Sequence, residues 1–286
     1  MDFSTFLIQT MNGLQYGLLL FLMASGLTLV FGIMHIINLA HGALYMIGAY
    51  LALWLMGYVD NLFLAILLGI PIAFTLGAVM ERTLIRTLYY RNHVDQVLLT
   101  FGLILIFSAA QSLLWGDEVH SVAIPEILSK SFSLTDNLSY PVYRVFISAV
   151  CAVVALGMYL LLQKTRLGMI IRAGANNREM VQGLGININW IYTLVFATGT
   201  ALTAFAGMIA APISSVYPGM GGEVLIACFV VVVIGGIGSI RGAFLGALLV
   251  GLTSIWGAVL VPDLAGAVMY VLMLAVLLFK PRGLFA

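Results

Sequence analysis

Charged residues are scarce in this sequence of 286 residues, since Asp, Glu, Lys and Arg make up only 8% of it. A soluble globular domain carries about 25% charged residues. The net charge is +1, so the chain offers no positive field that could hold the phosphates of a nucleic acid. Hydrophobic residues make up 63%. This composition excludes an ordinary soluble enzyme, a disordered chain and a nucleic-acid-binding protein, and leaves a protein that lies mostly in lipid.

Motifs of catalysis and metal binding are missing as well. The sequence contains no Walker A loop, no His-Glu-x-x-His zinc helix and no Gly-x-Ser-x-Gly nucleophile motif. Its two cysteines, Cys151 and Cys228, lie inside apolar runs, where we expect reduced packing residues. Proton-coupled transport would require an acid near the middle of a span, and the nearest candidates, Asp95 and Glu223, lie at segment ends. We therefore expect no catalytic residue, no metal, no cofactor and no energy source within the chain.

The sequence does contain continuous apolar runs about as long as a bilayer-spanning helix, which needs about 20 residues. The strands of a transmembrane barrel would instead alternate between apolar and polar residues. The runs cover 6–34, 39–58, 62–80, 95–115, 143–163, 191–213, 222–236, 243–261 and 264–279. They predict one all-α polytopic membrane domain over 1–286 with nine transmembrane helices, or eight if 222–236 is not a full span. The N-terminus carries Asp2 rather than the basic residues of a signal peptide, so we expect the first run to stay as a helix.

Lys and Arg are distributed unevenly between the two sets of loops that alternate along such a chain. One set contains ten: Arg82, Arg86, Arg91, Lys164, Arg166, Arg172, Arg178, Arg241, Lys280 and Arg282. The other contains only Lys130 and Arg144. Because cytoplasmic loops carry the excess of basic residues, the first set is predicted to be cytoplasmic, with the N-terminus outside and the C-terminus inside. Eight acids fall on the outer side: Asp2, Asp60, Asp117, Glu118, Glu126, Asp136, Glu223 and Asp263.

Two loops are long enough to have structure of their own. Residues 116–142 are polar and face outward, and Pro125 and Pro141 limit regular structure there. Residues 164–190 face inward and are too polar to span a membrane. Within them we predict a short helix at about 177–184, capped by Asn176 or Asn177, with Glu179 in its first turn and Gly183 or Gly185 at its end. On pattern alone this helix is either a docking element or a solvated connector.

Two further segments carry candidate functional residues. His35, Asn38 and His41 recur every three residues, which in a helix places them along one face. They are either interfacial groups at a cytoplasmic turn or the lining of a pathway. Gly235, Gly236 and Gly238 interrupt a Val-rich run. They indicate either a functional break in a membrane helix or close helix packing.

Four segments resemble one known family, the LivH-type permeases of branched-chain amino acid ABC transporters. They are GLTLVFGIMHIINLAHGALYMIGAYLA at 26–52, RAGANNREMVQGLGININWIYTLVFATGTALTAFAG at 172–207, GGIGSIRGAFLGALLVG at 235–251 and LLFKPRGLF at 277–285. The resemblance covers nearly the whole chain. It implies a multi-pass subunit of a bacterial inner-membrane importer, in which partner subunits, and not this chain, hydrolyse ATP.

The resemblance also implies the partners and the site residues. The partners are a second permease of the LivM type, two cytoplasmic ATP-binding subunits, an external substrate-binding protein, an amino-acid substrate and membrane lipid. The loop that contacts the ATPases in the family matches Arg172, Gly174, Asn177, Arg178, Glu179, Gly183 and Gly185, with Arg172 and Arg178 expected to pair with acids on the partner. Asn38 and His41 are expected near the translocation pathway, with His35, Gly235, Gly236 and Gly238. Branched-chain amino acids are the expected substrate, while urea, short amides or other amino acids, and a self-contained secondary transporter, remain alternatives.

Overall fold

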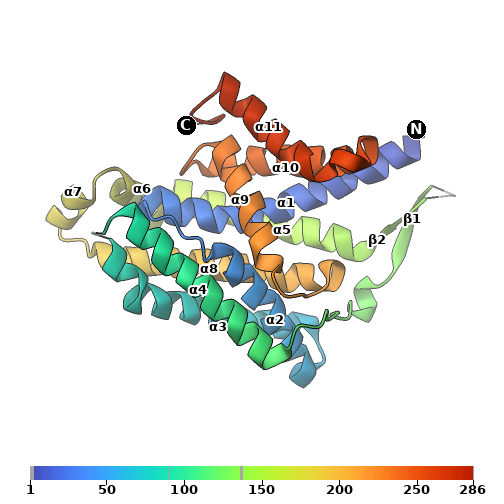
Figure 1. The fold of residues 1–286 in the computed structure, drawn as a ribbon, viewed down its shortest axis with the longest axis horizontal. Helices are drawn as coiled ribbons and strands as arrows, with labels where there is room; N and C mark the ends of the chain where they lie inside the picture. Colours follow the sequence, from blue (N-terminus) through green and yellow to red (C-terminus); the bar gives the residue numbers. More distant parts are fainter. Residues whose placement is uncertain (1–2, 90, 136–137, 286) are drawn as a thin grey trace.

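The computed structural model describes residues 3–89, 91–135 and 138–285, and the chain is folded almost entirely into helices (Figure 1). Asp2 and Asp136, which the charge pattern assigns to the outer side, lie outside these ranges. The helices that match predicted spans are α1 (Phe3–Met34), α2 (His41–Val59), α3 (Leu62–Thr83), α4 (His93–Trp115), α5 (Val142–Lys164), α8 (Ile188–Ser214), α10 (Ile240–Leu260) and α11 (Ala265–Phe279). This confirms the all-α membrane fold.

Eight helical segments of the described chain are long and apolar enough to cross a membrane, and the eighth, Pro262–Phe279, combines the 3₁₀ turn η3 (Pro262–Leu264) with α11. The ninth apolar run forms α9 (Met220–Gly235), which has only 16 residues. A full span needs about 20 residues. The helix lengths therefore support the eight-span alternative, in which 222–236 is not a full span, because the glycines at 235 and 236 end α9 after 16 residues.

The two long loops contain more regular structure than their sequences suggest. The loop after α4 carries the 3₁₀ turn η2 (Glu126–Leu128) and an antiparallel hairpin of β1 (Ser131–Thr135) and β2 (Leu138–Pro141). Phe132 pairs with Tyr140 across this hairpin, and their rings meet edge to face at 6.3 Å. The loop after α5 folds into α6 (Arg166–Asn176) and α7 (Arg178–Gly183). The hairpin and α6 were not predicted.

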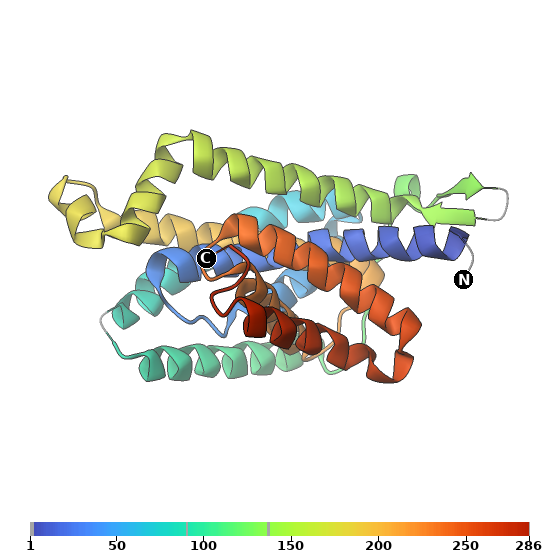
Figure 2. The same cartoon turned by 90° about the horizontal axis from the view of Figure 1, so that it is seen from above.

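α1 and α8 form the centre of the molecule. In the most apolar stretch of each, 83% and 78% of the residues are buried, whereas the corresponding fraction is 17% in α4 and 22% in α5. Figure 2 shows α4 and α5 on opposite flanks of the central helices, which leaves their outer surfaces to the surroundings. No residue of α11 is buried. The flanking helices α4, α5 and α11 are therefore the ones whose apolar side chains remain exposed on the single chain.

Small residues allow the central helices to approach closely, as small-residue interfaces do in membrane bundles. A Cβ atom on Gly48 of α2 would overlap the backbone of Ala204 in α8, and one on Gly207 of α8 would overlap the backbone of Tyr45 in α2. Gly26 of α1 meets Gly199 of α8 in the same way. The run of small residues at 199–207 therefore serves close helix packing.

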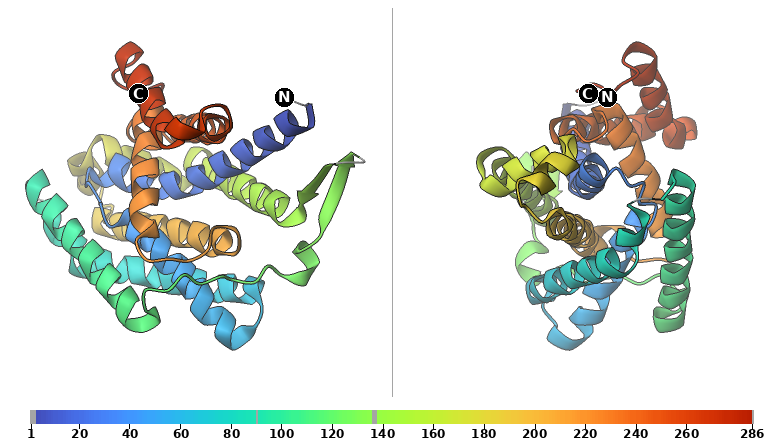
Figure 3. Two further views of the ribbon diagram at one scale, coloured as in Figure 1. Left: turned by 45° about the vertical axis from the view of Figure 1, so that its right-hand side comes forward. Right: turned by 90° about the vertical axis from the view of Figure 1, so that its left-hand side faces the viewer.

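The molecule has two ends, which we name by the elements that mark them. The hairpin end carries β1, β2 and the start of α1, and the α7 end carries α6, α7 and the 3₁₀ turn η1 (Ile85–Leu88) between α3 and α4 (Figure 1). The right-hand view of Figure 3 looks onto the α7 end. Residues 82–89, 91 and 164–187 lie at this end, so seven of the ten cations of the basic set gather there.

Candidate functional site

The segment between α1 and α2 is not helical, so His35, Asn38 and His41 do not share one helix face, and the alternative of a turn between two helices describes them. His35 has a φ of +53°, which ends α1, and its side chain is exposed. The chain then runs without helical structure to residue 38, and α2 begins at His41. A left-handed residue cannot continue a right-handed helix. His35 is thereby separated from Asn38 and His41, which are both 1% exposed.

His41 joins three central helices at one point. Its Nε2 lies 2.9 Å from the carbonyl oxygen of Met23 in α1 and 2.9 Å from Oγ1 of Thr203 in α8. Asn38 precedes this point, and its Oδ1 accepts a hydrogen bond of 3.1 Å from the backbone N–H of Ala40. The Nδ2 of Asn38 is buried and has no partner. The link between α1 and α2 is thus fixed by buried polar groups whose hydrogen-bonding capacity is only partly used.

The glycine segment is a break between two helices. α9 ends at Gly235, and Gly236 and Gly238 have φ values of +99° and +79°, which favour glycine. Ser239 then caps α10, since its Oγ accepts a hydrogen bond from the backbone N–H of Gly242. Gly238 also lies against Gly32 of α1, so the structure brings the break next to the end of α1.

The C-terminal segment completes this break. The backbone N–H groups of Leu284 and Phe285 donate to the carbonyl oxygens of Ile234 and Gly235, at 2.9 Å and 3.2 Å. These carbonyls belong to the last turn of α9, where no partner exists within the helix. The motif at 277–285 therefore has a structural task, which is to cap a helix that ends inside the molecule.

The segment after α5 contains the predicted short helix. Asn177 caps α7, because its Oδ1 accepts a hydrogen bond of 2.9 Å from the backbone N–H of Met180, and Glu179 lies in the first turn. Gly185 follows the helix with a φ of +80°. The cap and the terminal glycine are thus confirmed, and Gly183 is the last residue of the helix.

The neighbouring α6 connects this helix to α5. Thr165 caps α6 by accepting a hydrogen bond from the backbone N–H of Gly168. Gly174 is buried on the inner side of α6 beside Ile188, whereas Arg172 is exposed. Two short helices at an angle therefore replace the single helix expected in this loop.

Arg178, expected from the sequence to pair with an acid of a partner subunit, lies against two aromatic rings of its own chain. Its guanidinium Cζ lies 5.5 Å from the ring centroid of Tyr89 and 5.4 Å from that of Tyr192. The two rings meet edge to face at 5.2 Å. Cations are attracted to aromatic faces at such distances. Arg178 therefore connects α7 to the chain after α3 and to α8. Its expected pairing with an acid of a partner subunit stays a prediction.

Tyr89 also contacts a buried carboxylate, that of Glu81, which the sequence analysis did not identify. Glu81, at the end of α3, is 0% exposed and forms an ion pair with Arg86, whose Nη2 lies 2.9 Å from its Oε2. Thr193 of α8 donates to the same oxygen at 2.5 Å, and the Tyr89 hydroxyl donates to Oε1. Burial and the neighbouring carboxylate raise the pKa of Tyr89, so its hydroxyl remains a donor at neutral pH. The signal in the sequence was a lone acid beside a predicted cationic loop.

A cavity of about 290 Å³ opens at the hairpin end between α1, α8 and α9. Its α1 wall repeats every three or four residues, as one helix face does: Asn12, Gln15, Tyr16, Leu19, Leu20 and Met23. The α9 wall does the same, with Met220, Glu223, Val224 and Ala227. Tyr45, Arg144, Ile213, Ser214, Tyr217 and Ile255 complete the lining. The sequence reading assigned Glu223 and Arg144 only to the outer side and did not bring them together.

The polar groups of this cavity are held in place by hydrogen bonds. Arg144 donates to Oδ1 of Asn12 at 2.8 Å, and the hydroxyl of Tyr140 donates to the same atom at 3.1 Å. Tyr217 donates to Oε2 of Glu223 at 2.8 Å. Burial, followed by the Glu223 carboxylate, raises the pKa of Tyr217 to about 12, so this hydroxyl stays protonated.

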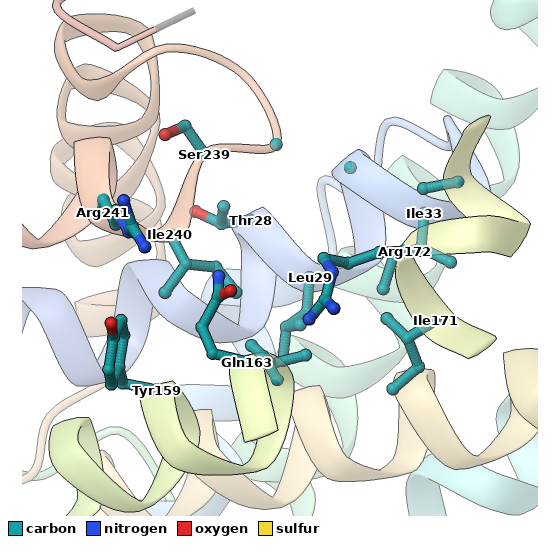
Figure 4. A pocket seen from close by; sticks show the side chains of 14 residues that line it. Thr28, Leu29, Ile33, Tyr159, Gln163, Ile171, Arg172, Ser239, Ile240 and Arg241 are labelled. Atoms are coloured by element: carbon teal, nitrogen blue, oxygen red, sulfur yellow. The ribbon is translucent and has the colours of Figure 1, made fainter. Parts of the chain in front are cut away.

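A second cavity, of about 230 Å³, lies at the α7 end (Figure 4). Its walls come from α1, α5, α6 and the start of α10, and they include Thr28, Gln163, Arg172, Ser239 and Arg241. Arg241 lies over the ring of Tyr159, with its Cζ 5.7 Å from the ring centroid. The α1 residues of this cavity, from Thr28 to Ile33, lie on a different helix face from those of the hairpin-end cavity. No residue lines both cavities, so they are separate cavities in this structure.

The six predicted pathway residues thus separate into groups. Asn38 and His41 lie together at the centre, Gly235, Gly236 and Gly238 form the break, and His35 is apart from both. Of these six, only Gly238 lines one of the two cavities. Within the described residues, no group of three or more His, Cys, Asp or Glu could hold a metal ion.

Comparison with known proteins decides the family. Residues 9–277 match the family described as branched-chain amino acid transport system / permease component. The chain belongs to this family. It is 34% identical to the high-affinity branched-chain amino acid transport system permease protein BraD of Pseudomonas aeruginosa, over 98% of this chain and 95% of that one. It is 30% identical to the corresponding permease protein LivH of Escherichia coli, over 99% and 96% of the two chains.

The chain is also similar to a more distant member of this family. A probable branched-chain amino acid transport permease protein LivH of Methanocaldococcus jannaschii is 28% identical over 94% of this chain and 89% of that one. No solved structure matches. The branched-chain permease family is thus recognised over nearly the full chain, including both cavities and the α6–α7 segment.

Proposed function

We propose that this branched-chain permease forms half of the translocation pathway of an ATP-driven importer for branched-chain amino acids. The observation that carries the proposal is the similarity over nearly the whole chain to relatives that are named as permeases of this transport system. The apolar helices provide a membrane body, and the chain has no phosphate-binding motif of its own. ATP hydrolysis belongs to partner subunits in this proposal.

The proposed assembly contains four further proteins. They are a second permease of the LivM type, two cytoplasmic ATP-binding subunits and an external substrate-binding protein. The α7 end faces the cytoplasm and the ATPases, and the hairpin end faces the binding protein, in the inner membrane of a bacterium. The concentration of Lys and Arg at the α7 end supports this orientation.

In this proposal α7 is the element that docks on an ATPase. Arg172, Asn177, Glu179 and Gly185 form or flank the docking surface, and the cap and the terminal glycine keep the helix rigid. Arg178 transmits a displacement of α7 to Tyr89 and Tyr192. The hydrogen bonds of Glu81 to Tyr89 and Thr193 then transmit it to α3 and α8. Because α8 is one of the two central helices, a small movement of α7 reaches the middle of the molecule by direct contacts.

The pathway residues of the proposal lie between the end of α1 and the start of α2, and between the end of α9 and the start of α10. His41 and Asn38 hold the link between α1 and α2, and Gly235, Gly236 and Gly238 allow α9 and α10 to change their angle. His35 lies at the rim of this region. Partly unsatisfied polar groups such as Nδ2 of Asn38 support a role in a region that rearranges, because a second arrangement can supply the missing partner.

The proposal is tested by reconstitution. The complete complex is placed in proteoliposomes with the binding protein, and uptake of labelled leucine, isoleucine, valine and urea is measured with and without ATP. ATP-dependent uptake of the three amino acids, and none of urea, is expected. Uptake without ATP would favour a self-contained transporter, and uptake of urea alone would replace the substrate assignment.

A further inference from the structure

The hairpin-end cavity contains one positive and one negative side chain that do not pair with each other. Arg144 and Glu223 both line it, while the one ion pair within the described residues joins Glu81 to Arg86. One N–H group of Arg144 donates a hydrogen bond to Asn12, and the carboxylate of Glu223 accepts one from Tyr217. A guanidinium has five N–H donors and a carboxylate has about four acceptor positions. Both groups therefore retain capacity for a ligand.

A third polar group in the same cavity has no partner at all. Gln15 is 4% exposed, and its Nε2 makes no hydrogen bond. An unpaired polar group in a buried position is costly, and it calls for an explanation. Gln15 lies on the cavity-lining face of α1, one turn from Asn12. A ligand that accepts a hydrogen bond would satisfy it.

The deeper part of the α1 and α9 walls is apolar, while the hydroxyl groups of Tyr16, Tyr45, Ser214 and Tyr217 also belong to the lining. Leu19, Leu20 and Met23 follow Gln15 along α1, and Ala227 follows Glu223 along α9. At about 1.5 Å per residue, Met23 lies about 12 Å further along α1 than Gln15. The polar groups thus lie near the hairpin end, and the apolar side chains continue toward the centre of the molecule. A volume of about 290 Å³ suits a small solute.

We propose that this cavity binds an aliphatic amino acid as its zwitterion. Arg144 and Nε2 of Gln15 receive the carboxylate, Glu223 receives the ammonium group, and Leu19, Leu20 and Met23 contact the aliphatic side chain. The inference rests on the proposed import function and adds that the permease itself selects the charge state of its solute. A solute with only one of the two charges leaves Arg144 or Glu223 without a counter-charge, and urea has neither charge.

The test is equilibrium binding of labelled leucine to the purified complete complex without the substrate-binding protein. Saturable binding is expected, and Arg144→Gln, Glu223→Gln and Gln15→Leu should each weaken it about tenfold or more. Lys130→Gln and Asp263→Asn are matched controls, because they remove charges at the hairpin end from residues that do not line the cavity, and both should bind as the unchanged complex does.

Competition with analogues distinguishes ligand contacts from damage to the fold. In the unchanged complex, 4-methylpentanoate, which lacks the amino group, should compete poorly with leucine. Glu223→Gln should bind this acid at least as well as the unchanged complex does, although its affinity for leucine falls. Equal loss of both ligands, or unchanged leucine binding in all three variants, would overturn the site.

The uptake assay keeps this inference separate from the proposed function. If the unchanged complex imports no branched-chain amino acid with ATP and the binding protein, the proposed function fails. If it imports leucine but shows no saturable binding without the binding protein, or if the three variants import leucine with an unchanged KM, the proposed function stands and the zwitterion site is wrong.

Discussion

At the residue scale, buried polar groups in an otherwise apolar molecule mark the positions that matter. Glu81 has an ion pair and three hydroxyl or guanidinium donors around it, which offset the cost of burying its charge. Asn38 and Gln15 each retain an unpartnered amide nitrogen. The Glu81 carboxylate holds helices together, whereas the amide nitrogens of Asn38 and Gln15 are free to bind a hydrogen-bond acceptor.

Replacing Glu81 by Gln should destabilise the chain. The substitution keeps the shape but removes the charge that pairs with Arg86 and accepts from Thr193 and Tyr89. Because Arg86 is 37% exposed and water screens its part of the ion pair, we expect a loss of about 2 kcal/mol. A fall of the Tm by several degrees in detergent would report it. Glu118→Gln, at an exposed acid, is the control, and an equal Tm for the two variants would contradict the assignment.

Replacing Asn38 by Leu should lower transport about tenfold, the loss expected when about 1.4 kcal/mol of a required interaction is removed. The variant loses the acceptor for the backbone N–H of Ala40 and the spare amide group, but it should still insert and assemble. Uptake and co-purification of partners are measured together. Asn92→Leu is the control, since Asn92 also precedes a helix but makes no cap hydrogen bond. Normal uptake by Asn38→Leu would return this residue to a packing role.

At the element scale, the proposed function depends on the places where helices are interrupted. α1 ends at a left-handed His35, α9 ends at paired glycines, and the 164–187 segment folds back as two short helices instead of crossing the membrane. The ends of two of these elements are closed by specific caps, Asn177 for α7 and the C-terminal segment for α9. Elements that end inside the molecule can change their angle without losing their own hydrogen bonds.

Replacing Gly185 by Val should uncouple the transporter and leave the chain inserted. Gly185 has a φ of +80°, and a β-branched residue there is strained by about 1–2 kcal/mol, so the end of α7 should change direction. Solute-stimulated ATP hydrolysis and co-purification of the ATPases are expected to fall. Ser133→Val is the control, because Ser133 is exposed on the hairpin at the opposite end of the molecule and its replacement should leave coupling unchanged. Glu179→Lys should uncouple as well, since it places a positive charge at the start of α7. Normal import and hydrolysis by both Gly185→Val and Glu179→Lys would make α7 a connector only.

At the scale of the whole molecule, local patterns in the sequence predicted the helices, whereas features that depend on distant contacts were missed. Run length indicated the membrane helices, and Asn177 with Gly185 indicated α7, because length and caps are local properties. The hairpin-end cavity joins Gln15, Arg144 and Glu223 from three helices, and no spacing in the chain indicates that they meet. The spacing of His35, Asn38 and His41 fits both a helix face and a turn between two helices, and only the structure, with a φ of +53° at His35, decides for the turn.

The last prediction concerns the orientation of the chain in the membrane. It can be tested by labelling introduced thiols, because the two native cysteines are buried. Cys151 and Cys228 are free and 0% exposed, so they should not react with a membrane-impermeant maleimide. Ser133→Cys places a thiol on the exposed hairpin, and Gln182→Cys places one on the exposed side of α7. The excess of Lys and Arg at the α7 end predicts that intact cells, made permeable only in their outer membrane, label the hairpin variant and not the α7 variant. Inverted membrane vesicles should give the reverse. Labelling of the α7 variant in intact cells would place the coupling segment outside and remove the basis for its contact with a cytoplasmic ATPase.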